Sequence, residues 1–186
     1  MISAVSSVAL GVTLRRLYFI RFAFALLWAA LVFTAGSAAG PLQTVLLVLY
    51  PLVDAGAVLM QIRSEGDSRG PRPAEQINVI LSTLAAIALA WASTVSTPAV
   101  LLAWGAWAIV SGLTQLVAAI IRRKSHGQVP LMISGGISIL AGGAFAAQGL
   151  QGGGTVAGVG GYAVLGGIFF LIAAIRLSIS LKKVSA

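Results

Sequence analysis

The sequence contains no cysteine, one histidine and only four acidic residues among 186. Without cysteine there can be no disulfide, thiolate catalysis or cysteine-ligated metal, and His126 alone cannot build a metal centre. No pairing of a nucleophile with a base and no phosphate-binding loop can be assembled from so few polar groups. We therefore expect a protein that is not an enzyme and that holds no metal or cofactor.

Charge is scarce overall: 9% of the residues are charged, 59% are hydrophobic and the mean hydropathy is +1.01. Because a soluble domain carries about 25% charged residues, this composition excludes a water-soluble globule. We expect an all-α bundle of six transmembrane helices in which residues 1–186 form a single integral membrane domain in the lipid bilayer. Six apolar stretches are long enough to span a membrane, at residues 18–37, 42–62, 76–95, 98–121, 130–148 and 156–177.

All twelve basic residues fall on one side of this threading, at or before the first span, in loops 63–75 and 122–129, and at the end of the chain. The opposite connections, 37–41, 96–97 and 149–155, carry no charge. The positive-inside rule then places both termini in the cytoplasm. The net charge of +8 reports this topology, and we expect no nucleic-acid partner.

The first fourteen residues are apolar and Ser-rich, and the nearest arginines follow them. This is the wrong order for a cleaved signal peptide, which begins with a basic region. We expect residues 1–14 to be retained as an interfacial segment that leads into the first span, because they are too few to cross a bilayer.

Each even-numbered span places an aromatic residue nine positions after a helix-starting residue. From the aromatic onward, the second and third copies run in parallel as Trp-Ala-Ile-Val-Ser-Gly and Tyr-Ala-Val-Leu-Gly-Gly, each followed by an Ala-Ala-Ile run and an arginine. The first copy departs from this pattern at Pro51 and Asp54. Offsets of 57 and 55 residues predict a helical hairpin repeated three times in parallel. The three pairs are Pro41 with Tyr50, Pro98 with Trp107, and Gly153 with Tyr162.

This repeated pattern, from about residue 21 to residue 176, resembles the bacterial acid-resistance membrane protein (HdeD-like) family, whose members are built of short two-helix repeats. The resemblance implies a multi-pass protein of the bacterial inner membrane that contributes to acid or envelope stress tolerance. It supplies no molecular activity.

Asp54 is the one acidic residue inside a predicted span, about 13 Å from the end of that span at Arg63. A carboxylate at that depth should face the bundle interior, find a donor or keep its proton. Gln43, Tyr50 and Gln61 share its helix face, since the spacings are seven, four and seven residues. This face predicts either a polar path for protons or a small solute, as in a small transporter or channel, or a packing contact that fixes helix register.

Two further groups have competing interpretations. Glycine pairs concentrate after residue 130 and predict close helix packing, with a dimerisation face in a homo-oligomer or a flexible gate as alternatives. Arg122, Arg123 and Lys124 are candidates for contacts with anionic lipid headgroups, although their role as topology determinants explains them equally well.

Overall fold

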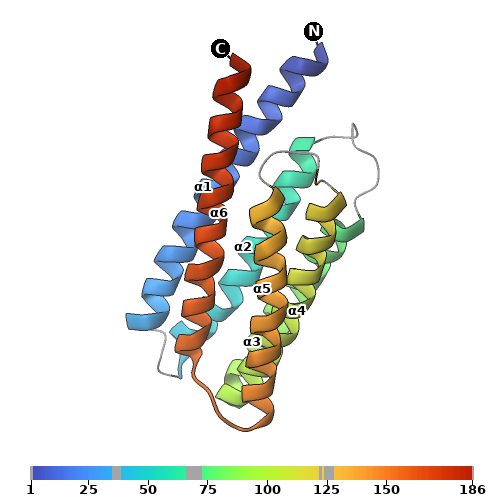
Figure 1. Cartoon of the computed structure of the whole chain (residues 1–186). Helices are drawn as coiled ribbons and strands as arrows, with labels where there is room; N and C mark the ends of the chain where they lie inside the picture. Colours follow the sequence, from blue (N-terminus) through green and yellow to red (C-terminus); the bar gives the residue numbers. More distant parts are fainter. Residues whose placement is uncertain (1, 35–38, 66–72, 122, 124–127, 186) are drawn as a thin grey trace.

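The computed structural model describes residues 2–34, 39–65, 73–121, 123 and 128–185, and in these residues it is helical without strands. The six helices run alternately up and down, so both termini lie at the same end (Figure 1). The predicted all-α fold is confirmed. The helices are α1 (Ile2–Thr34), α2 (Pro41–Glu65), α3 (Pro73–Val95), α4 (Thr97–Ile121), α5 (Gln128–Leu150) and α6 (Val156–Ser185).

All six helices are long and apolar enough to cross a membrane. Five contain the predicted spans within a few residues, but α1 differs. It is continuous from Ile2, well before the predicted start at residue 18, and its segment Gly11–Thr34 is long and apolar enough to cross a membrane. No proline interrupts this stretch, and Gly11 packs directly against Leu181 of α6, so residues 2–14 belong to the first helix. Their interfacial position stays a prediction.

The helices form a closed ring in chain order, because each contacts its neighbours and α1 also packs against α6. The closest packing joins α4 to α5, α1 to α6 and α2 to α3, whereas the α1–α2 and α5–α6 contacts are sparse. The α1–α6 pair also runs past the other helices at the end that carries the termini (Figure 1). Contacts between neighbouring predicted hairpins, as between α4 and α5, are therefore more extensive than the contacts within two of the hairpins, α1–α2 and α5–α6. The threefold repeat itself stays a prediction.

Glycines set the closest approach, between α4 and α5. A Cβ atom built on Gly105 would lie 2.6 Å from the carbonyl oxygen of Gly142, and one on Gly112 would lie 2.7 Å from that of Gly135. In lipid, where helix association depends on packing, such contacts let two backbones meet directly. On α6, Gly160 and Gly167 instead lie against side chains of α1, those of Phe33 and Ala25.

The centre of the ring is filled by aromatic side chains. Trp28 and Trp104 stack with ring centroids 5.6 Å apart, and Tyr50, Trp107 and Tyr162 surround them. The three residues at equivalent positions of the predicted repeat thus converge on Trp104. We call these five residues the aromatic cluster. On the outside, large apolar side chains are exposed on every helix, as a lipid-facing surface requires.

Candidate functional site

Asp54 lies inside the bundle, 9% exposed, and forms an ion pair with the guanidinium of Arg21 on α1. Both side chains are nearly buried, with exposed fractions of 10% and 15%. Charges at this depth are stable only when they are paired and hydrogen-bonded. The pair also spans the sparse contact between α1 and α2, so it links two helices that share little other packing.

Two donors from α3 complete the surroundings of the carboxylate. Asn78 Nδ2 donates to Asp54 Oδ2 at 2.8 Å, and the hydroxyl of Ser82 donates to the same oxygen at 3.0 Å. Asn78 and Ser82 are four residues apart and therefore lie on one face of α3. With Arg21, three donors converge on the two oxygens of Asp54.

Each of the two donors from α3 is in turn held by a residue of α4. Trp107 Nε1 donates to the hydroxyl of Ser82 at 2.9 Å, and Thr114 Oγ1 donates to Asn78 Oδ1 at 2.8 Å. The hydrogen bonds therefore all point toward Asp54, from α4 through α3 to α2. Such a directed network fixes the orientation of every member.

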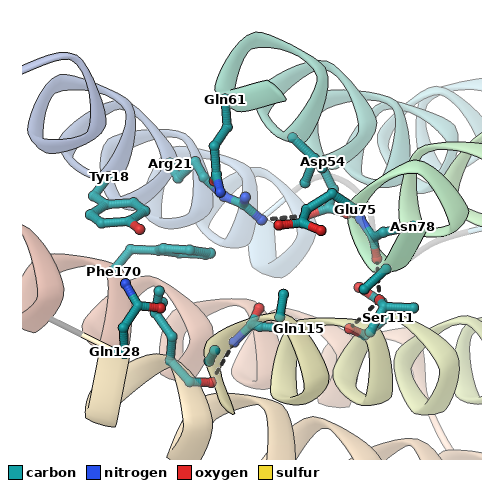
Figure 2. Close-up of a pocket in the computed structure, with 16 residues that line it drawn as sticks. Tyr18, Arg21, Asp54, Gln61, Glu75, Asn78, Ser111, Gln115, Gln128 and Phe170 are labelled. Carbon is teal, nitrogen blue, oxygen red and sulfur yellow. Dashed lines mark hydrogen bonds and ion pairs between the residues drawn. The ribbon is translucent and has the colours of Figure 1, made fainter. Parts of the chain in front are cut away.

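Beside this network lies a cavity of about 60 Å³, lined by both apolar and polar side chains, to which all six helices contribute (Figure 2). It lies toward the end of the bundle that carries the termini, since Glu75 is the third residue of α3 and Gln128 the first of α5. We call this the basic end, because Arg16, Arg176 and other basic residues lie there. The polar lining consists of Tyr18, Arg21, Asp54, Gln61, Glu75, Asn78, Ser111, Thr114, Gln115 and Gln128.

The α1–α6 pair closes one side of the cavity. The guanidinium carbon of Arg21 lies 4.0 Å from the centre of the Phe170 ring, and Tyr18 stacks on Phe170 with centroids 6.0 Å apart. Figure 2 shows Arg21, Gln61 and Asp54 across the space from Phe170 and Gln115. The cavity therefore lies between the α1–α6 pair and the other four helices.

Deeper in the bundle, the aromatic cluster follows directly on the Asp54 network. Trp107 belongs to both, because its indole nitrogen bonds Ser82 while its ring meets Tyr50 at a centroid distance of 5.9 Å. Trp104 is fully buried, and its Nε1 has no hydrogen-bond partner among the described residues. The aromatic cluster thus lies beyond the Asp54 network, and none of its five residues lines the cavity.

The four residues of the predicted polar face have different surroundings. Asp54 and Gln61 line the cavity, whereas Tyr50 belongs to the aromatic cluster. Gln43 is buried near the start of α2, about 16 Å from Asp54 along the helix. Of the candidate lipid contacts, Arg123 is exposed, while residues 122 and 124 lie outside the described part of the chain. The role of each of these residues stays a prediction.

Sequence analysis missed most partners of Asp54. Arg21 was counted with the topology-determining arginines, but the structure places it within the membrane-length part of α1. One signal was available, since an isolated acidic residue in a span calls for a cation at matching depth. Nothing in the sequence singled out Asn78, Ser82 or Thr114 as its further neighbours.

No group of three or more His, Asp or Glu side chains gathers anywhere in the described ranges. The polar and charged groups of the cavity could bind a small polar solute, rather than a metal ion, through hydrogen bonds and charge. The open space corresponds to a few water molecules, at about 10 to 15 Å³ for each.

Comparison with known proteins places a repeat within this architecture. Residues 77–147 match the family described as a short repeat of unknown function (DUF308). The match runs from α3 through α4 into α5 and includes Asn78, Ser82 and Thr114, but neither Arg21 nor Asp54. No curated protein and no solved structure shows a significant match to the chain. The chain is therefore a multi-pass membrane protein, with six membrane-length helices in the residues that the structure describes, and residues 77–147 of it are similar to the DUF308 repeat.

Proposed function

We propose that this protein is an HdeD-like protein of the bacterial inner membrane, with both termini in the cytoplasm, that contributes to acid or envelope stress tolerance without being an enzyme. The DUF308 match and the six membrane-length helices support this proposal. The charge asymmetry of the sequence supports its orientation, because the basic end faces the cytoplasm under the positive-inside rule.

For its molecular activity, we propose that the cavity binds a small polar solute from the cytoplasmic side, as the first step of transport or sensing. One observation carries this: the one acidic residue of the predicted spans is paired with Arg21 at the wall of a cavity rather than in a closed contact between helices. A permanently open channel is disfavoured, because the aromatic cluster fills the path beyond Asp54.

The test is survival of a deletion strain after an acid challenge, complemented at matched membrane levels. Wild type should restore survival, whereas Asp54→Asn should not, because it removes the charge that holds Arg21. The paired variant Arg21→Met/Asp54→Asn separates loss of folding from loss of function, since it leaves no unpaired buried charge. We expect it to be expressed normally and still to fail. Full rescue by both variants would contradict a role for the cavity, and survival without any complementation would contradict the stress role.

A further inference from the structure

We propose that the cavity binds a small neutral amide, a solute that donates and accepts hydrogen bonds and carries no charge. This inference rests on the proposed function, because it names the solute class of the same site. It begins with Gln128, the first residue of α5, which lines the cavity and is only 7% exposed. Its side-chain amide has no hydrogen-bond partner among the described residues, so its polar atoms are available to a solute in the cavity.

The charges of the wall argue against an ion as the solute. Arg21 and Asp54 form an ion pair, and the carboxylate of that pair has two further donors from α3. Glu75, the other acidic residue of the lining, also has an interaction partner of its own. An entering ion would bring a charge that no unpaired charge of the described lining compensates, which is costly away from water. The wall therefore favours a neutral solute.

The neutral polar groups of the cavity call for both donors and acceptors in the solute. Gln61 also lines the cavity without a hydrogen-bond partner among the described residues, and a glutamine amide has two N–H donors and an accepting oxygen. The amide nitrogen of Gln115 donates to the carbonyl of Leu131 at 2.9 Å, which leaves its amide oxygen as an acceptor. Figure 2 shows Gln61 on one side of the space and Gln115 on the other. A solute amide can pair with both sides, whereas an apolar solute would leave these groups unpaired.

The apolar lining and the size of the space limit the rest of the solute. Val58, Ala118 and Leu131 line the cavity beside the polar groups and can pack against a short alkyl group. About 60 Å³ holds about four to six water molecules, and therefore a solute with about that number of non-hydrogen atoms. This space is far smaller than the roughly 300 Å³ at which pockets for drug-sized ligands begin. A compact amide such as acetamide meets these requirements.

The experiment measures the melting temperature of the purified full chain in detergent with probes of nearly the same shape. Acetamide is neutral and has both donors and an acceptor, whereas acetone is neutral and only accepts. Acetate is the anionic probe and acetamidinium the cationic one. A ligand that binds only the folded state raises the melting temperature with concentration. We expect acetamide to do so at millimolar concentrations, and the other three probes to have no such effect at equal concentration and ionic strength.

Three variants locate the effect. Gln128→Met and Gln61→Met each replace an amide of the cavity by an apolar side chain of similar length. Each should require about tenfold more acetamide for the same shift, because a hydrogen bond to the solute is lost. The second variant keeps the test informative if the first folds poorly. Gln76→Met, at an exposed position of α3 outside the cavity lining, is the control and should respond as wild type does.

No shift with acetamide, or equal shifts with acetamide and acetone, would overturn the inference. So would an unchanged acetamide response in both Gln128→Met and Gln61→Met, or stabilisation by acetate or acetamidinium at lower concentrations than by acetamide. These failures are distinct from failure of the proposed function. If Asp54→Asn abolishes acid survival while acetamide does not bind, the solute class is wrong and the stress role stands. If acetamide binds but the deletion strain survives the acid challenge without complementation, the solute class stands and the stress role is wrong.

Discussion

The ion pair between Arg21 and Asp54 offers the sharpest test of how this bundle is held together. We expect Asp54→Asn and Arg21→Met each to lower the free energy of unfolding, and the double variant to lower it by less than the sum of the two. Both side chains are at most 15% exposed, so removing one charge leaves the other buried without its partner.

The magnitude follows from what each change leaves behind. Breaking a buried ion pair costs about 3 to 5 kcal/mol in soluble proteins, whereas single polar contacts in membrane proteins average about 0.6 kcal/mol. Here Arg21 keeps its contact with Phe170, and Asp54 keeps the donors Asn78 and Ser82. We therefore expect about 2 kcal/mol for each single variant and a coupling energy of at least about 1 kcal/mol.

The assay is unfolding in mixed detergent micelles, followed by tryptophan fluorescence. Trp107 is a useful reporter, because it is bonded to Ser82 and lies within two hydrogen bonds of Asp54. Effects of independent sites add within about 0.5 kcal/mol. If the two single effects add to the double within that margin, the side chains do not interact, and the structural basis of the site is wrong.

Two further predictions concern packing. Gly142→Val should destabilise the bundle by about 2 kcal/mol or more, because a Cβ there would lie 2.6 Å from a backbone oxygen of α4. Gly143→Val is the control and should be nearly neutral, since nothing lies within 4 Å of a Cβ built at that position. Unfolding in the same micelles compares the two variants. Trp28→Phe should cost about 1 to 3 kcal/mol, because it removes the 2.7 Å hydrogen bond to a carbonyl of α2 in the buried core, and a smaller loss would show that ring packing alone holds Trp28.

The number and type of helices could be predicted from the sequence, because length and hydropathy alone decide what crosses a bilayer. Asp54 could be placed inside for the same reason, since a lone carboxylate cannot face lipid. Its partner could not be assigned. Arg21 lies close to the basic residues of the same end in sequence, and only the packing of α1 against α6 and α2 brings it to the depth of Asp54.

The polar face of α2 shows a second limit of sequence periodicity. Spacing correctly identifies residues that share a face, but it says nothing of what each one meets along the membrane normal. Tyr50 is one turn from Asp54, or about 6 Å, and already lies among aromatic rings rather than in the cavity. Those rings come from α1, α4 and α6, so their convergence depends on the ring order of the helices.

Two kinds of contact hold the helices of the bundle together: glycine contacts and polar side-chain bridges. Where helices touch backbone to backbone, as α4 and α5 do, glycines make the closest contacts. Where packing is sparse, side chains bridge the gap: Arg21 reaches Asp54 from α1, and the hydroxyl of Tyr162 on α6 donates to Ser138 on α5 at 3.0 Å. Both bridges attach the α1–α6 pair to the other four helices, and the cavity opens between the same two parts. A solute that binds next to Arg21 would therefore act where the α1–α6 pair meets the other four helices, and there the helix contacts are sparse.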